Sequence, residues 1–454
     1  MLTSVNPATG ELIATYAEHT AGEITDIVER TADAQRLWEE SDFAGRSEKM
    51  KAAAAILRNR KEQFARLITG EMGKPIRQSR AEVDKCARVC EHYALHAKDY
   101  LANEPIPTEA TQSYIAYRPL GVVLAVMPWN FPFWQVFRFA APALMAGNAA
   151  LLKHASNVCG SAQAIESVFI EAGFPRDLFR VLKVRGEKVG EVIGNQHVKA
   201  VTLTGSVPAG RAIASKAGAL LKKTVLELGG SDPYLILEDA DLESAVPICV
   251  RSRTINSGQS CIAAKRFIVT SSQLDRFLEL FTREMERLRM GDPTEDGVDI
   301  GPQSSERLRD ELHQQVRSSI HRGARCLLGG EVPRQKGSWY PPTVLAGVKA
   351  GMPAYDEELF GPVAAVIEAR DDADAVRIAN DSVFGLGAAV FTRHEGRGRH
   401  IAEKLINAGC CFVNEMVVSD PRLPFGGIGD SGYGRELSYA GIREFTNIKT
   451  VYIK

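Results

Sequence analysis

The sequence lacks an excess of charge of either sign. Its 454 residues carry 55 Lys and Arg against 56 Asp and Glu, a formal net charge of −1. A protein that binds nucleic acid or an anionic membrane through bulk electrostatics needs a basic excess, so the composition disfavours both partners. Charged residues make up 24% of the chain and are mixed with 45% hydrophobic residues, which is typical of a folded chain. The length predicts about three domains.

The sequence also lacks the segments that direct a chain into or across a membrane. The first residues, MLTSVNPATGELI, show neither a basic region nor an apolar run, unlike a signal peptide. One uncharged stretch, 119–137, has the length of a membrane span. It contains Pro119, Pro128 and Pro132, which favours two buried strand or loop pieces followed by the start of a helix. We therefore expect a cytoplasmic protein without a membrane partner.

A disulfide framework and a metal-ligand cluster are missing as well. The eight cysteines are scattered along the chain and predict reduced thiols. Two pairs are spaced one helical turn apart, namely Cys86 with Cys90 and His92 with His96. However, Tyr93 stands where a metalloprotease helix needs its glutamate, and no further ligands follow nearby. We interpret the four residues as structural parts of one helix and expect no metal.

Secondary-structure signals are present in two alternating series. The first hundred residues show apolar residues spaced three and four apart, as in helices, and the stretch 47–73 ends at a glycine. Strand and helix patterns then alternate over 121–228 and again over 233–414. Such alternation predicts βαβ units, mostly parallel sheets and an α/β fold. Residues 445–454 alternate like an edge strand without a visible local partner, which suggests pairing across subunits.

Three local patterns carry candidate chemistry. Cys261 lies in NSGQSCIAAKRF, a turn where a thiol can face a cleft, although a small buried hydrophobe is the alternative. Glu227 ends the apolar strand of VLELGG. Burying a carboxylate is costly unless it faces a cleft, and a surface-turn glutamate is the alternative. In PWNFP, two prolines fix Asn130, whose amide can stabilise an oxyanion, although a proline-rich turn with an Asx cap is also open.

The segment TLTGSVPAGR is a weak signal for a phosphate site. A strand pattern leads into Gly205 and Ser206, and Pro208 can occupy the first turn of a helix. The free N–H groups at such a helix start attract phosphate. Because the spacing is not G-x-G-x-x-G, a plain strand-to-helix turn is equally open.

Together, the motifs resemble one family. PWNFP, LLKHASN, the TGS turn, LELGGSDP, GQSC, EELFGP and PFGG…SGYGRE occur in the order and approximate spacing of the aldehyde dehydrogenase superfamily. The resemblance covers essentially the whole chain and is closest to the succinate-semialdehyde dehydrogenases, particularly short bacterial and cyanobacterial forms. It implies an α/β aldehyde dehydrogenase-like fold with three parts. These are a Rossmann-like cofactor domain (1–100 and 120–229), an α/β catalytic domain (230–430) and a small β oligomerisation flap (101–119 and 431–454) of a homodimer or dimer of dimers.

The resemblance implies catalytic roles for three residues. Cys261 would attack the aldehyde carbon, and the Asn130 amide and the Cys261 N–H would stabilise the resulting oxyanion. After hydride loss to the nicotinamide, Glu227 would activate the water that hydrolyses the thioester. Relatives that pass the acyl group to coenzyme A lack this glutamate, so hydrolysis is expected. No metal is required.

The resemblance further implies cofactor contacts. Family positions around the adenosine, pyrophosphate and nicotinamide ribose match Trp129, Lys153, Gly205, Ser206, Leu228, Glu358 and Phe360. Ser156 stands where NAD-preferring relatives often place a glutamate that repels a 2′-phosphate. A serine removes that repulsion, and Lys153 adds positive charge. We expect NADP rather than NAD, although Ser156 could also merely cap the following helix.

Two further positions resemble those that hold the distal carboxylate of succinate semialdehyde, namely Arg138 and Ser419. A buried arginine on an apolar helix face needs an anion, although its stem could simply snorkel. Several relatives carry a second arginine where this chain has Ile255, so carboxylate binding would depend more heavily on Arg138.

The expected function is the oxidation of succinate semialdehyde to succinate with NADP. A broader aldehyde dehydrogenase, acting on other ω-carboxylated or aliphatic aldehydes, is one alternative. A catalytically silent homologue is another, and it is disfavoured because Cys261, Glu227 and Asn130 are all present.

Overall fold

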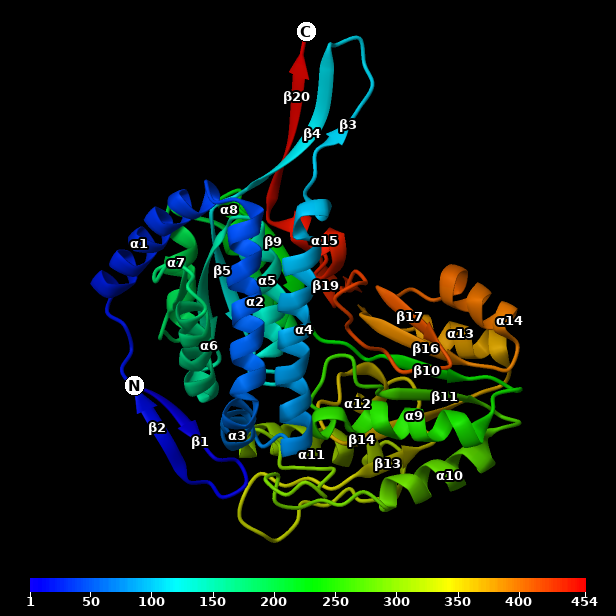
Figure 1. The fold of residues 1–454 in the computed structure, drawn as a ribbon. Coiled ribbons are helices and arrows are strands. Elements are labelled where there is room, and N and C mark those ends of the chain that lie inside the picture. Colours follow the sequence, from blue (N-terminus) through cyan, green and yellow to red (C-terminus); the bar gives the residue numbers. More distant parts are fainter.

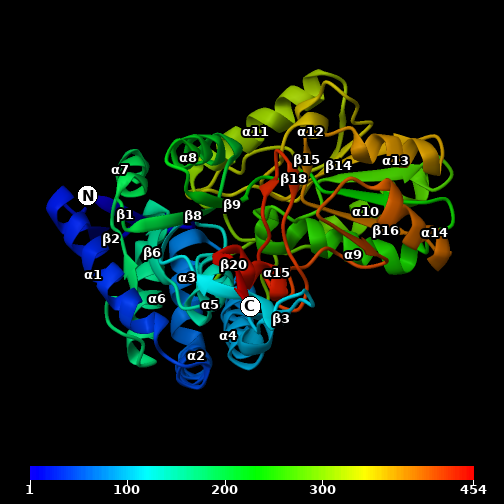
Figure 2. The same ribbon diagram turned by 90° about the horizontal axis from the view of Figure 1, so that it is seen from above.

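The chain folds into two α/β lobes and a small projecting sheet (Figure 1). A computed structural model describes residues 1–454. The lobes lie side by side when seen from above, and the C-terminal segment lies between them (Figure 2). Each lobe contains a mainly parallel sheet, so the predicted α/β fold class is confirmed.

The first lobe is built on a six-stranded sheet with a Rossmann-like strand order. In sheet order its strands are β19 (Gly432–Tyr433), β9 (Lys223–Glu227), β8 (Val198–Thr204), β5 (Val122–Met127), β6 (Ala149–His154) and β7 (Phe179–Val181). All neighbours are parallel except β19 and β9. The chain order reverses between β5 and β8, and ligands of such sheets bind at the carboxyl ends beside that reversal.

Helices cover both faces of the first sheet. They are α1 (Ala21–Glu39), α2 (Phe43–Asn59), α3 (Lys61–Met72), α4 (Ile76–Tyr100), α5 (Trp134–Met145), α6 (Cys159–Glu171), α7 (Val189–Gly194), α8 (Val207–Ala219) and α15 (Ser438–Glu444). The helical pattern over 47–73 is split into α2 and α3 at Arg60, whose backbone leaves the helical region. The predicted glycine end is correct, because Gly73 adopts φ +80° there.

The second lobe contains a seven-stranded sheet. In sheet order its strands are β12 (Arg325–Leu328), β13 (Thr343–Ala346), β14 (Val363–Ala369), β11 (Arg266–Thr270), β10 (Pro233–Ile236), β16 (Gly387–Phe391) and β17 (Cys410–Val413). Its helices are α9 (Leu242–Thr254), α10 (Leu274–Glu286), α11 (Glu306–His321), α12 (Pro353–Asp356), α13 (Asp372–Asn380) and α14 (Glu395–His400). Successive side chains point to opposite faces, so β10 sends Tyr234 into one apolar cluster, with α9 and α10, and Leu235 into another, with α11 and α13.

The uncharged stretch 119–137 forms strand β5, a loop and the start of α5, as predicted. None of the helices combines the length and apolarity that crossing a membrane requires. Cys86 and Cys90 are fully buried on α4, while the rings of His92 and His96 pack against each other with centroids 4.7 Å apart.

The C-terminal strand β20 (Thr446–Ile453) has a partner within the same chain. It pairs antiparallel with β4 (Gln112–Pro119), which also pairs with β3 (Glu104–Pro105). This partner is not local, because β4 lies more than 300 residues earlier in the chain, and the suggested pairing across subunits stays a prediction. The three strands project from the body of the molecule (Figure 1). Short pairs β1 (Leu2–Val5) with β2 (Leu12–Tyr16) and β15 (Phe384–Gly385) with β18 (Ile428–Gly429) complete the fold.

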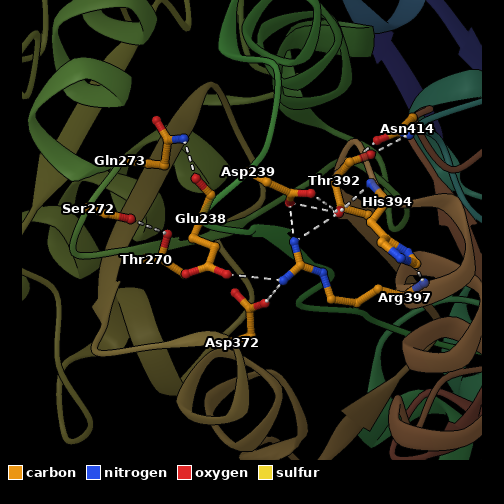
Figure 3. A network of polar contacts seen from close by, with 10 residues as sticks. All are labelled: Glu238, Asp239, Thr270, Ser272, Gln273, Asp372, Thr392, His394, Arg397 and Asn414. Atoms are coloured by element: carbon orange, nitrogen blue, oxygen red, sulfur yellow. Dashed lines mark hydrogen bonds and ion pairs between the residues drawn. The ribbon is translucent and has the colours of Figure 1, made fainter.

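The carboxyl edge of the second sheet is closed by a polar network (Figure 3). Arg397 forms ion pairs with Glu238, Asp239 and Asp372. Thr392 Oγ1 donates to Asp239 Oδ1 over 2.7 Å. These contacts hold the loops after β10 and β16 together, and the opposite edge of the sheet faces the first lobe.

Candidate active site between the two lobes

The candidate residues meet where two sheet edges face each other. In the first lobe they follow the carboxyl ends of strands: Asn130 after β5, Ser156 after β6 and Gly205 after β8. In the second lobe they precede strands instead, since Cys261 lies before β11 and Glu358 before β14. The site thus combines the carboxyl edge of one parallel sheet with the amino edge of the other.

The loop that carries Cys261 has an unusual backbone. Asn256 and Ser257 are buried with φ of 55° and 54°, and Gly258 follows with φ +75°. A Cβ atom on Gly258 would lie 2.2 Å from the backbone of Gly361, so only glycine fits. Consecutive left-handed residues cost about 1–3 kcal/mol each and persist where the surroundings enforce them. This turn presents Cys261 toward the first lobe.

Hydrogen bonds across the lobes bring Asn130 to this loop. Asn130 Nδ2 donates to the Gln259 carbonyl over 3.2 Å, and Asn256 Nδ2 donates to the Asn130 carbonyl over 2.7 Å. The alternative in which Asn130 caps its own turn is wrong, because its Oδ1 has no hydrogen-bond partner. The second N–H of its amide and the unbonded N–H of Cys261 stay available as donors.

Cys261 lines a cavity of about 1240 Å³ between α4, α5, α9 and the loop between β17 and β18. It is half-buried rather than enclosed, unlike the small buried hydrophobe considered as the alternative, and it is the only cysteine in the cavity wall. Burial raises the pKa of the Cys261 thiol to about 12, opposed by the charges of Lys265 and Arg138. Without ligands the thiol is therefore protonated at neutral pH and needs a base to react.

Glu227 is buried at the end of β9, with 2% of its surface exposed. A surface-turn glutamate is thus excluded. Neither carboxyl oxygen has a hydrogen-bond partner, and the side chain does not line the Cys261 cavity. Burial, and then the neighbouring carboxyl of Glu436, raise the pKa of Glu227 well above its usual range, while Arg138 opposes the shift. A carboxyl with a raised pKa is suited to exchange protons near neutral pH.

Arg138 forms an ion pair with Glu436 and donates through Nη2 to Thr204 Oγ1 over 3.2 Å. Glu436 therefore supplies one anion to this buried arginine, and the expected contact of Arg138 with a substrate carboxylate stays a prediction. Simple snorkelling is excluded, because only 2% of Arg138 is exposed. The residue still lines the cavity with Ser419 and Ile255, so it contributes positive potential there.

Sequence reasoning missed Lys85, which donates to Ser419 Oγ over 2.6 Å. Lys85 lines the same cavity as Cys261. The helical spacing offered a signal for Lys85, because it lies three residues after Glu82 and four before Val89. Both of these residues are buried on the inner face of α4. Glu436 was also missed, although it belongs to the quoted motif SGYGRE.

Residues expected at the nicotinamide ribose come together from both lobes. The rings of Trp129 and Phe360 meet edge to face with centroids 5.8 Å apart. Glu358 accepts from the Gly230 N–H over 3.0 Å and pairs with the buried Lys265 over 3.3 Å. Glu358 and Phe360 also line a second cavity of about 510 Å³ beside α11.

The residues expected at the phosphates have unused polar groups. Lys153 makes no hydrogen bond or ion pair through Nζ, and burial lowers its pKa. Ser206 begins α8 without a side-chain cap, and the buried side chain of Leu228 packs on Gly210 of this helix. Ser156 does not cap α6, because no side chain caps that helix; the capping alternative is wrong. An ammonium and a helix start without anionic partners are groups that fit a phosphate-bearing cofactor.

The fold and the sequence motifs together identify the protein family. A model of the aldehyde dehydrogenase family matches residues 1–451, and the chain belongs to that family. The resemblance inferred from the motifs is thereby confirmed.

Particular relatives cover the full length. A protein named probable succinate-semialdehyde dehydrogenase [NADP(+)] from Synechocystis sp. is 48% identical over 452 residues, covering 100% of this chain and 99% of its own length. A succinate semialdehyde dehydrogenase [NAD(P)+] from Escherichia coli is 49% identical over 99% of this chain and 97% of its own. The crystal structure of succinic semialdehyde dehydrogenase from Streptococcus pyogenes with NADP+ superposes with a TM-score of 0.98 at 37% identity, and each chain is covered completely.

The raised pKa of Cys261 predicts slow alkylation in the ligand-free protein. The rate of iodoacetamide modification at Cys261 should rise about tenfold per pH unit from pH 7 to 10, because only the thiolate reacts. Peptide mass spectrometry measures this rate, with the exposed Cys326 as an internal comparison in the same sample. A rate that levels off below pH 8 would contradict the assignment.

Proposed function

We propose that the protein oxidises succinate semialdehyde to succinate and uses NADP. One observation carries the proposal: the Asn130 amide bonds to the loop that carries Cys261, and Cys261 lines a large cavity whose wall contains seven cationic and four acidic side chains. Such a wall favours an anionic aldehyde. The full-length relatives named as succinate-semialdehyde dehydrogenases support the same substrate.

Cys261 acts as the nucleophile on the aldehyde carbon. Because burial keeps the thiol protonated, its proton passes to water in the cavity as sulfur bonds to carbon. The amide of Asn130 and the N–H of Cys261 donate to the oxygen that becomes negative. Lys265 Nζ donates to the carbonyl oxygens of Ser260 and Cys261, which fixes the backbone that supplies the second donor.

Glu227 acts as the base that activates water for hydrolysis. Its carboxyl is buried beside Glu436 and outside the cavity wall, so the side chain must turn toward Cys261 to act. The pKa values of Glu227 and Glu436 are both raised by burial, and the positive charge of Arg138 opposes the rise at each of them. The charge of Arg138 thus favours the carboxylate form of Glu227, which burial disfavours.

The cofactor is held by residues of both lobes. Lys153 and Ser156 would hold the ribose phosphate that distinguishes NADP, and Gly205 with Ser206 the pyrophosphate. Trp129, Leu228, Glu358 and Phe360 would complete the site. When bound, NADP supplies the acceptor for the hydride of the aldehyde carbon.

A broader range of aldehydes is the second candidate function. The cavity of about 1240 Å³ exceeds the needs of a four-carbon substrate, and its wall includes Phe131, Trp134 and Ile255. These apolar side chains can accommodate longer aliphatic aldehydes. A panel of aldehydes that differ in length and terminal charge separates the two candidates.

Glu227→Gln tests the reaction scheme. Turnover of succinate semialdehyde should fall about 10²–10⁴-fold, while a rapid burst of NADPH close to one per active site should remain, because water is activated after the hydride leaves. Stopped-flow absorbance measures both phases. The control Glu243→Gln changes an exposed glutamate of α9 and should leave both unchanged. Full steady turnover in Glu227→Gln would refute this role, and wild-type protein that does not oxidise the substrate would refute the function.

Ser156→Glu tests the cofactor assignment. A carboxylate there should lower kcat/KM for NADP relative to NAD by about tenfold or more, through repulsion of the 2′-phosphate. Ser156→Ala is the matched control, because it removes the hydroxyl without adding charge and should keep the preference for NADP. Native protein that prefers NAD would contradict the assignment.

We further propose a homodimer or dimer of dimers assembled through the projecting sheet, and a cytoplasmic location. Strand β20 has one unpaired edge, and it exposes Ile448, Tyr452 and Ile453 by 63%, 55% and 45%. Exposed apolar edge strands favour pairing with another chain.

Sedimentation velocity tests the assembly. The wild-type protein should sediment as a dimer or tetramer, and the double variant Ile448→Glu, Tyr452→Glu should shift toward smaller species. Leu37→Glu, at an equally exposed apolar position on α1, should not. A wild-type monomer at micromolar concentration would overturn the proposal.

A further inference from the structure

Lys85 lies in the wall of the Cys261 cavity with its ammonium group held in place. Nζ donates to Ser419 Oγ over 2.6 Å and lies 4.0 Å from the ring centre of Trp134. These contacts join α4, α5 and the loop between β17 and β18. A long flexible side chain is thus fixed at one point of the cavity wall, where it is half-buried.

Most other cations of this wall already face a carboxylate. Five of the seven form ion pairs, namely Arg77 with Asp299, Arg138 with Glu436, Arg251 with Glu415, Arg287 with Glu284 and Arg422 with Asp420. Lys85 and Arg88 have no acidic partner within 4 Å. Arg88 is exposed and therefore surrounded by water. Lys85 is the half-buried cation that can accept an anion without breaking an ion pair.

The surroundings of Lys85 disfavour its charge in the ligand-free protein. Burial lowers the pKa of Lys85 to about 7, and Arg138 on α5 adds to the effect. On its own helix, Arg88 acts in the same direction, and Glu82 and Cys86 oppose it. The facing loop carries Asp420 and Arg422, which pair with each other. A carboxylate that enters the cavity would supply the missing counter-charge.

We propose that Lys85, together with the Ser419 hydroxyl, binds the distal carboxylate of the aldehyde substrate. The inference rests on the proposed oxidation of a carboxylated aldehyde and names the residue that selects it. With one ammonium hydrogen used by Ser419, two remain for the carboxylate, and the Ser419 hydroxyl can donate its own hydrogen. Arg138, already paired with Glu436, adds positive potential to the same cavity wall.

Substrate selectivity tests the proposal. Lys85→Met keeps the length of the side chain and removes its charge. The ratio of kcat/KM for succinate semialdehyde to that for butanal should fall about 10- to 100-fold, with butanal turnover nearly unchanged. Arg88→Met removes a neighbouring cation one turn along α4 and should change the ratio less than about threefold. Equal losses for both aldehydes in Lys85→Met would assign Lys85 a structural role and overturn the proposal.

Equilibrium binding of succinate gives a readout without turnover. Calorimetry at pH 8 in two buffers of different ionisation enthalpy should show uptake of close to one proton per succinate, because the carboxylate raises the pKa of a lysine that is mainly neutral at that pH. Lys85→Met should weaken binding and abolish the uptake. Unchanged affinity and uptake in this variant, or no succinate binding by the wild type, would overturn the proposal. Wild-type protein that binds succinate through Lys85 but oxidises no carboxylated aldehyde would refute the proposed function alone.

Discussion

The hydrogen bonds between Asn130 and the loop at 256–259 are the contact on which the site depends. They join the carboxyl edge of one sheet to the amino edge of the other. Because the loop adopts left-handed backbone at Asn256 and Ser257, its shape is maintained by partners rather than by intrinsic preference. Because the proposed nucleophile and the proposed oxyanion donor lie on different lobes, neither lobe contains the candidate site alone.

Buried charges around this contact are balanced in pairs. Lys74 pairs with Glu82, Arg138 with Glu436 and Lys265 with Glu358. Each ion would be costly to bury alone, and an ion pair offsets that cost only when its geometry is good. Glu227 and Lys85 are among the groups near the site that form no ion pair. In the proposed reaction, Glu227 activates water and Lys85 binds the carboxylate of the substrate.

Much of the architecture was readable from local pattern. Strand β5 is a continuous apolar run, and helix α5 begins where the prolines of 128–132 end. The motif residues Cys261, Asn130 and Glu227 were found because their surroundings are chemically unusual. The partner of Arg138 was not found, since Glu436 lies 298 residues away and only the folded chain brings them together. Lys85 was missed for the same reason, because its significance comes from Ser419 and the absence of an acidic neighbour.

The pairing of β19 with β9 has a consequence for how the chain is made. Gly432 lies opposite Glu227, and Glu436 lies beside it, so the cover over the proposed base comes from a segment that is synthesised long after β9. Until that segment leaves the ribosome, it cannot pair with the edge of β9. The burial of the proposed base therefore has to follow the folding of the strands that precede it.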